Sequence, residues 1–387
     1  MTDAATSPPS GIPGLDPADV LSAARRQLGI SDGILRSCRW RSLWAPRLAS
    51  TSGVYRIDWL IESERGTREG ALVLKVLACL GPNVAPGGAT LYASGALDNL
   101  PSGLRAARWF GNIDLGPDHL GVWLDPEQDD PDVAWDVERF GIAARHLGRL
   151  AGTHEQALRE QAGQRPARTF WGNPAYVHDT LRTFAGEAAH DLARRAWPEP
   201  SKRALLRLWT GSGAMVERAQ SLPVMPCHGD AQRRNLFARR DASGVTSGEA
   251  SSHVTVAVDW ANFGMAPAGM DIATLAHYAI AYFDVAADDI IRLEVAVLDS
   301  YLDGLRDQGV DIDRATVRFG YAAQLVFGLG LLETGPVLRL ATTSALHRSA
   351  EAFYGQPIEA ILDRRWVLAG YLLDVALRME RMELDHP

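Results

Sequence analysis

Cysteine is scarce in this chain of 387 residues, which carries only Cys38, Cys79 and Cys227. An odd and sparse set of cysteines argues against a disulfide framework and favours a reducing compartment. Cys227 stands beside His228, but no further cysteine or histidine follows at a metal-ligand spacing. We therefore expect Cys227 to be a buried structural residue rather than a metal ligand or a nucleophile.

Long apolar runs are also missing, and none reaches the roughly 18 residues that a membrane-spanning helix needs. The longest candidate, residues 321–332, is interrupted by Gln324 and predicts a buried helix. Residues 1–14 hold Asp3 and three prolines, but neither the basic nor the apolar region of a secretory signal. We expect a cytoplasmic protein with no membrane partner.

An excess of positive charge is absent as well. The chain has 39 lysine and arginine residues against 47 aspartate and glutamate residues, for a net charge of −8. It lacks the basic footprint of a nucleic-acid-binding protein, so we expect no nucleic-acid partner. The chain has no G-x-x-x-x-G-K-[ST], and Gly328–Gly330 lacks the third glycine of G-x-G-x-x-G. A P-loop or dinucleotide enzyme is therefore disfavoured.

The most informative stretch is residues 225–236, MPCHGDAQRRNL, followed by an apolar run, VTVAVDW, at 254–260. Phosphoryl transfer needs a carboxylate that accepts the proton of the attacking hydroxyl, and hard oxygen ligands that hold Mg²⁺ against the phosphates. Asp230 fits the first role, and Asn235 and Asp259 fit the second. Taken singly, either motif is also compatible with an Asx-capped turn or a solvated strand end.

The two motifs in this order resemble the aminoglycoside phosphotransferase and choline kinase family, which shares the protein-kinase architecture. His228–Asp230 is similar to the His-Arg-Asp of protein kinases, and Asp259–Trp260 to their Asp-Phe-Gly. Asp271–Ala273 is similar to a family D-[IL]-A run whose aspartate supports the catalytic loop. The resemblance implies an α+β, bilobal protein-kinase-like fold, with a small antiparallel β-sheet N-lobe and a large, mostly helical C-lobe.

A lone lysine in an apolar strand is a further candidate. Lys75 interrupts residues 72–77, LVLKVL, where a cation must reach a counter-charge or water. By resemblance, Lys75 contacts the nucleotide phosphates, and a turn that includes Ser52 and Gly53 covers them. From the residues alone, a lysine on the solvent face of an edge strand and an ordinary hairpin are alternatives.

The resemblance also places the adenine base against main-chain groups of Val122, Trp123 and Leu124, at the connection between the lobes. One part of the family pattern is missing, because Gly88 stands where a glutamate that pairs with the lysine is expected. Which acid, if any, pairs with Lys75 is left open by the sequence.

Apolar residues make up 47% of the chain, and its length suggests two or three structural units. We expect a tail and helix over 1–35, a nucleotide-binding sheet over 36–121, a linker over 122–132, and a helical lobe with the catalytic loop and acceptor pocket over 133–387. Periodicity predicts strands at 36–42, 54–63, 71–80, 236–238 and 254–258, and helices at 16–28, 138–158, 203–220, 271–284, 287–306, 312–333, 338–354 and 358–382.

Two functions from different classes follow. The first is a Mg²⁺-dependent kinase that uses ATP or GTP to phosphorylate a small molecule, such as an aminoglycoside, a sugar or an amino alcohol. The second is a nucleotide-binding pseudokinase or regulatory protein, which the glycine at position 88 suggests.

The acceptor and the oligomeric state are not readable from the sequence. Arg233 and Arg234 suit the γ-phosphate or an anionic acceptor, and are equally compatible with solvent exposure. Candidate acids of an acceptor pocket are Asp284, Asp288, Asp289 and Glu333. Exposed acids on helices are commonly just solvated, so none of them is singled out.

Overall fold

The structure is a computed structural model, and it describes residues 12, 14–44, 51–79, 87–164, 195, 198–210, 213–240, 253–330, 337 and 339–380. Contacts divide the chain into two compact units. The sheet unit comprises Met1–Asn99, Arg105–Asp129 and Val256–Ala261. The helical unit comprises Leu100–Leu104, Asp130–Thr255 and Asn262–Pro387. The chain therefore returns to the sheet unit late, at a segment that the sequence pattern assigned to the helical lobe.

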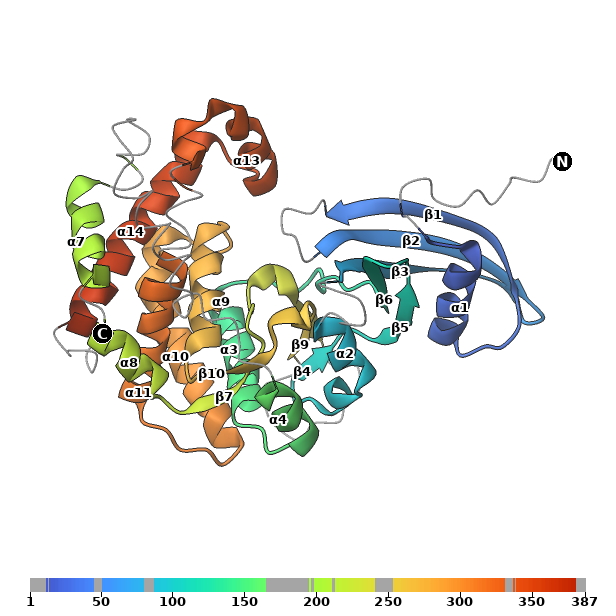
Figure 1. Cartoon of the computed structure of the whole chain (residues 1–387), viewed down its shortest axis with the longest axis horizontal. Helices are drawn as coiled ribbons and strands as arrows, with labels where there is room; N and C mark the ends of the chain where they lie inside the picture. The colour runs from blue at the N-terminus through green and yellow to red at the C-terminus, as the bar shows by residue number, and fades with distance from the viewer. Residues whose placement is uncertain are drawn as a thin grey trace. The chain divides into compact units, whose positions relative to one another are not determined.

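The sheet unit is built on a five-stranded antiparallel sheet of order β1-β2-β3-β6-β5 (Figure 1). The strands are β1 Ile34–Trp44, β2 Thr51–Ser63, β3 Gly66–Ala78, β5 Trp109–Asp114 and β6 His119–Leu124. Helix α2 Gly87–Ala93, the 3₁₀ helix η1 Ala96–Asn99 and strand β4 Leu104–Ala106 come between β3 and β5. The first three strands begin earlier than predicted. In β2 and β3 the added residues are polar residues and glycines that continue the ladder between these two strands.

Helix α1, Pro17–Leu28, packs into the core of the sheet unit. Its start and end are those predicted: Asp16 accepts the amide of Ala18 at 2.7 Å, and Gly29 closes the helix in the left-handed region. Val20, Ala23 and Ala24 join the buried face of β2 in one cluster. Residues 17–28 therefore belong to the sheet unit, where the sequence had set residues 1–35 apart.

The helical unit holds most of the helices (Figure 1). They are α3 Val137–Ala151, α4 Gln156–Gly163, α7 Glu199–Thr210, α8 Gly213–Gln220, α9 Met270–Ala281, α10 Ile290–Asp307, α11 Arg314–Ala323, α13 His347–Tyr354 and α14 Ile358–Glu380. Strand β7 Val224–Cys227 pairs with β10 Gly264–Pro267, and β8 Leu236–Arg240 and β9 His253–Ala257 lie in a sheet of order β4-β9-β8. A sheet unit and a helical unit confirm the predicted α+β fold.

Several predicted helices differ from those observed. The region 203–220 holds α7 and α8, and the helix expected at 338–354 is interrupted at Thr343 before α13 begins at His347. The helix expected at 138–158 is two helices, because α3 ends at Ala151 and the Thr153 hydroxyl accepts the amide of Glu155 instead of letting the helix continue. The helix expected at 312–333 ends its α-helical part at Ala323 and continues as a π-helical turn over Gln324–Gly330. Among the described residues, no helix combines the length and the apolar character needed to cross a membrane.

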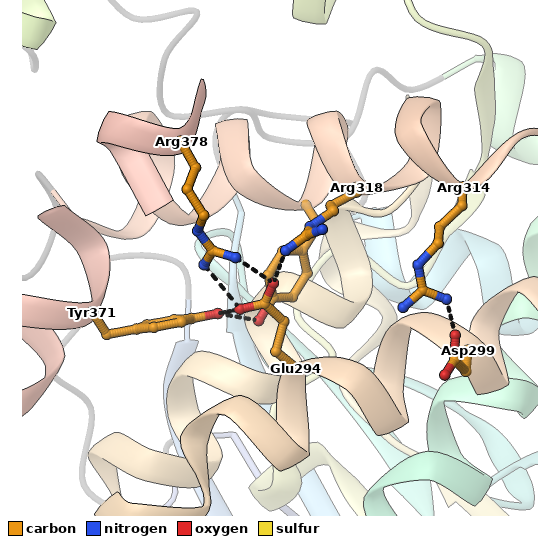
Figure 2. Close-up of polar contacts among 7 residues, drawn as sticks. Glu294, Asp299, Arg314, Arg318, Tyr371 and Arg378 are labelled. Atoms are coloured by element: carbon orange, nitrogen blue, oxygen red, sulfur yellow. Dashed lines mark hydrogen bonds and ion pairs between the residues drawn. The ribbon is translucent and has the colours of Figure 1, made fainter. Parts of the chain in front are cut away.

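A buried charge network joins α10, α11 and α14 (Figure 2). Glu294 is 3% exposed and contacts the guanidinium groups of Arg318 and Arg378, each at 3.2 Å. The hydroxyl of Tyr371 donates to the same carboxylate at 2.7 Å, and lies 2.9 Å from the hydroxyl of Tyr321. Because Arg318 is only 2% exposed, Glu294 is its main compensation for lost water.

This network gives a stability prediction. Replacing Glu294 by leucine leaves the Arg318 guanidinium buried without its carboxylate, which should lower the free energy of unfolding by about 3–5 kcal/mol. The exposed ion pair of Arg314 and Asp299 beside it serves as the control (Figure 2). Asp299→Ala should cost about 0–1 kcal/mol. Urea unfolding of both variants measures the difference, and equal losses would contradict the assignment.

Candidate functional site

The loop between β7 and β8 holds the polar residues of the first motif. The Asn235 side-chain nitrogen donates to a carboxylate oxygen of Asp230 at 2.9 Å and to its main-chain oxygen at 2.9 Å. The Gln232 side chain donates to the other carboxylate oxygen at 2.9 Å. These bonds fix the orientation of the Asp230 carboxylate, and they leave the Asn235 carbonyl oxygen as the part of that amide suited to a cation.

A buried carboxylate holds this loop in place. Asp271, in the first turn of α9, is 4% exposed and accepts the main-chain amides of His228 at 2.6 Å and Gly229 at 2.8 Å. Burial raises the pKa of Asp271 to about 6, while the two amide bonds act in the opposite direction. Gly229 has φ +80°, and a Cβ there would collide with the main-chain oxygen of Asn262, so only glycine fits. The aspartate of the D-I-A run thus supports the loop.

In the sheet unit, Lys75 and Asp259 form an ion pair at 2.5 Å. Lys75 lies on β3, which is flanked by β2 and β6, and its side chain is 12% exposed. It is therefore not a solvated lysine on an edge strand. Asp259 follows β9 and has φ +60°, a left-handed conformation that aspartate tolerates better than most residues. The acid that pairs with Lys75 in the described part of the chain is thus Asp259.

Helix α2 carries position 88, where the acid that pairs with the lysine was expected. Gly88 is buried, and a Cβ there would lie 3.5 Å from the main chain of Ala261, two residues after Asp259. One turn later, Tyr92 is 7% exposed, and its hydroxyl has no hydrogen-bond partner among the described residues. Burial, followed by the charges of Asp259 and Glu127, raises the pKa of Tyr92. Sequence reasoning missed Tyr92, although its spacing from Gly88 was a usable signal.

The residues expected around the nucleotide lie in strands. Ser52 and Gly53 belong to β2 rather than to a turn, and the register shift between Thr51 and Gly53 makes Ser52 a bulge residue. Gly53 pairs with the neighbour of Lys75 on β3. The rest of the expected turn, residues 49–50, lies outside the described residues.

Val122, Trp123 and Leu124 are the last residues of β6, where the sequence predicted the start of a linker. Strand β6 is flanked by β3 and β5, so its main-chain groups serve the sheet on both sides. The β5 ladder is interrupted between Trp109 and Asn112, opposite Trp123. Val122, Trp123 and Leu124 are at most 5% exposed, so their side chains pack in the core.

The two arginines of the loop lie against aromatic rings of the helical unit. The Arg233 guanidinium lies 4.9 Å from the ring centre of Trp135. The Arg234 guanidinium lies 4.2 Å from the ring centre of Tyr282 and 4.1 Å from that of Phe353. Of the candidate acids, Glu333 lies outside the described residues, and Asp289 pairs with Arg292 at 3.7 Å.

The donors available for a metal are few. Within the described residues, no group of three or more histidine, cysteine, aspartate or glutamate side chains is close enough to hold an ion. The sheet unit offers the Asp259 carboxylate, and the helical unit offers the Asn235 carboxamide. Mg²⁺ is commonly held by one or two protein oxygens together with phosphates and water. Each of these donors, taken by itself, is of the type that suits a cation arriving with a nucleotide.

No protein-family model and no curated protein matches this chain. Similar solved structures include the amicoumacin kinase hAmiN, with AMP-PNP, Ca²⁺ and Ami (16% identity, 89% of this chain, 94% of that chain, TM-score 0.48). Another is a choline/ethanolamine kinase family protein from Mesorhizobium loti (14% identity, 94% of this chain, 98% of that chain, TM-score 0.48). A third is a spectinomycin phosphotransferase in complex with ADP and spectinomycin (10% identity, 85% of this chain, 93% of that chain, TM-score 0.44). We rest the proposed function on the site residues rather than on these likenesses.

The role of Asp271 can be tested by amide exchange. In Asp271→Asn, one of the two loop amides loses its acceptor, because the carboxamide presents an N–H donor in place of an oxygen. We expect hydrogen exchange at His228 and Gly229 to accelerate about 10- to 100-fold, since a lost bond to a charged group is worth about 1.5–3 kcal/mol. Global thermal unfolding should change less, because the variant also removes the cost of burying a charge.

Asp230→Asn is the matched control, because it alters a carboxylate in the same loop without touching these two amides. Acidification should reproduce the effect in the unaltered protein. Asp271 has a pKa of about 6, so it is ionised above that value and protonated below it. After correction for intrinsic rates, exchange at the two amides should rise as the pH falls through about 6. Exchange that is unchanged in Asp271→Asn would show that this carboxylate does not order the loop.

Proposed function

We propose that this protein is a small-molecule kinase, which transfers the γ-phosphoryl group of ATP or GTP to a hydroxyl group of its acceptor. The observation that carries the proposal is the ion pair of Lys75 and Asp259. An ion pair set into an apolar sheet costs desolvation that packing alone does not require. Such charges concentrate where a protein binds a charged ligand. Here the ligand would be the triphosphate of the nucleotide, which would carry Mg²⁺ with it.

Asp230 is the catalytic base. Its carboxylate, held by Gln232 and Asn235, orients the acceptor hydroxyl and takes its proton. The acceptor oxygen forms a bond to the γ-phosphorus, and the bond to the oxygen bridging the β- and γ-phosphates breaks, releasing the nucleoside diphosphate. In a loose transition state the proton leaves late, so orientation of the hydroxyl contributes more than basicity.

The remaining site residues bind the nucleotide. Lys75 contacts its phosphates, with Ser52 and Gly53 beside it on β2. Among Val122–Leu124, Trp123 stands opposite the interrupted ladder, where main-chain contacts to the base can form. Asn235 and Asp259 hold Mg²⁺, which neutralises phosphate charge when bound.

The acceptor class includes antibiotics such as aminoglycosides, sugars and amino alcohols. The three cysteines are free, which supports our expectation of a reducing, cytoplasmic compartment. This function requires no basic surface, which agrees with our expectation that nucleic acid is not a partner. Soluble small molecules are the expected partners.

A second candidate is a nucleotide-binding pseudokinase. It is favoured by Gly88, because Lys75 then depends on Asp259, the residue that must also serve the metal. In that case the protein binds nucleotide without transferring phosphate. The two candidates share the binding site and differ in whether Asp230 has a role in turnover.

Nucleotide binding is tested by thermal unfolding. Mg²⁺ with ATP at about 100 times Kd should stabilise the chain by about 2.7 kcal/mol, which is about 2–4 °C for a chain of this size. Mg²⁺ alone should give no shift, because the protein supplies too few ligands. Asp259→Ala should remove the shift, whereas Asp98→Ala, an acid after α2, should keep it. A full shift in Asp259→Ala would remove Asp259 from the site.

Turnover separates the kinase from the pseudokinase. Asp230→Asn should keep the thermal shift with Mg²⁺ and ATP, because the base does not hold the nucleotide. It should lower kcat about 100- to 10,000-fold, the usual contribution of a general base. The measurement is phosphoryl transfer to a panel of hydroxyl acceptors. Binding without transfer in the unaltered protein would favour the pseudokinase, and full activity in Asp230→Asn would exclude Asp230 as the base.

A further inference from the structure

Arg234 connects the catalytic loop to a cluster of aromatic rings. It is exposed and directly precedes Asn235. Its guanidinium lies over the rings of Tyr282, at the end of α9, and Phe353, on α13. These two rings are nearly perpendicular, with centres 5.9 Å apart. The cation is thereby held on two sides at a point that adjoins the proposed base and metal ligand.

The rings around Arg234 form one continuous cluster. Tyr278 stacks on Tyr282 with ring centres 5.0 Å apart, and Tyr354 contacts both Tyr282 and Phe353. All four rings are partly exposed. Partly exposed aromatic faces of this kind are the usual site for a cationic ligand group. In this chain an arginine of the protein itself takes that position.

The main chain at the end of α9 is strained. Phe283 has φ +67°, the left-handed region that bulky side chains seldom adopt. Arg364 lies 4.5 Å from the Phe283 ring centre and donates to the main-chain oxygen of Val285 at 2.8 Å. Strain that surrounding contacts maintain is found preferentially at ligand sites. The left-handed conformation of Phe283 sets the direction of the chain directly after Tyr282, whose ring contacts Arg234.

Arg234 brings a positive charge to this cluster of rings. Among the described residues, Arg234 makes no hydrogen bond or ion pair, and its guanidinium contacts the two rings. The acids on neighbouring elements have other partners: Glu351 accepts the amide of Ile358 at 3.1 Å, and the charge of Asp288 acts on Arg364. Stacking engages the plane of a guanidinium, so its edge N–H groups can still bind an oxyanion in two-pronged fashion.

We propose that Arg234, positioned by Tyr282 and Phe353, selects acceptors that carry an oxyanion, a carboxylate or a phosphate, near the hydroxyl to be phosphorylated. The inference rests on the proposed function and narrows its acceptor class. A polycationic acceptor such as an aminoglycoside is disfavoured, because Arg234 already covers the ring faces and repels an ammonium group. The net charge of −8 would steer cations over a distance, but contacts at the site decide specificity.

The test compares acceptors in matched pairs, with Mg²⁺ and ATP and the full chain. One pair is a hydroxy acid and its methyl ester, a second is a sugar phosphate and its parent sugar, and kanamycin and choline represent cations. The first two pairs distinguish a carboxylate from a phosphate. The unaltered protein should prefer the anionic member of at least one pair.

The variants are Arg234→Gln, Arg234→Lys and a control, Arg306→Gln. Arg306 is an exposed arginine on α10 that pairs with Asp303. Arg234→Gln should lower kcat/KM for the preferred anionic acceptor about 10- to 100-fold, the value of a charge-assisted bond. It should change kcat/KM for the uncharged partner less than about 3-fold, as should Arg306→Gln for either. Arg234→Lys keeps the positive charge but loses the two-pronged N–H geometry of the guanidinium. Its kcat/KM for the anionic acceptor should lie between those of the unaltered protein and Arg234→Gln.

The inference is overturned if the ester or a cation is the better acceptor, if Arg234→Gln affects the acid and ester alike, or if no anionic acceptor is phosphorylated. Thermal unfolding of each variant establishes that it is folded. The thermal shift with Mg²⁺ and ATP distinguishes the two levels of failure. A thermal shift together with phosphoryl transfer to cationic acceptors alone would overturn this inference and keep the proposed kinase. The absence of both the thermal shift and phosphoryl transfer would overturn both.

Discussion

The buried carboxylate of Asp271 is the interaction on which the candidate site depends. Two loop amides converge on it, and the loop places Asp230 and Asn235 against each other. A loop that runs between strands must satisfy its main-chain donors. Supplying the acceptor from the first turn of α9 couples the loop to the helical core. The cost is a charge taken out of water, and the raised pKa of Asp271 expresses it.

The same helix connects the loop to the acceptor side. Asp271 stands at the start of α9 and Tyr282 directly after its end, where it meets Arg234. One rigid element thus contacts the catalytic loop twice, through a carboxylate at one end and a ring at the other. Most residues of α9 are buried, so packing holds the helix in place. Phe283, whose main chain is strained, follows the end of the helix. Residues on rigid elements position a site more accurately than residues on free loops.

Much of this arrangement was readable in the sequence, because its signals are local. The cap of α1 and the alternation of Ile57 and Trp59 act within a turn or a strand. The aspartate of the D-I-A run was identified by resemblance instead, because the loop amides that it binds are distant in sequence. Boundaries were less readable. The break after Ala151 depends on a hydroxyl that competes for one amide. The early start of β3 depends on its own residues 66–69, which show no apolar alternation but pair with the end of β2.

Contacts between distant segments were not readable. The partner of Lys75 is an aspartate that the motif had assigned to the metal, and nothing in either segment encodes their meeting. The stacking of Arg234 on α9 and α13 is of the same kind, because it joins a loop to rings far along the chain. Both contacts place a cation of the protein where a ligand's charge has to be met. The Lys75 ammonium would have to share the Asp259 carboxylate with a metal ion that binds there. The Arg234 guanidinium lies against two rings and would lose no ion pair when it binds an anion. Under the proposed function, the nucleotide side is therefore the one that rearranges on binding, while Arg234 already has its position on the acceptor side.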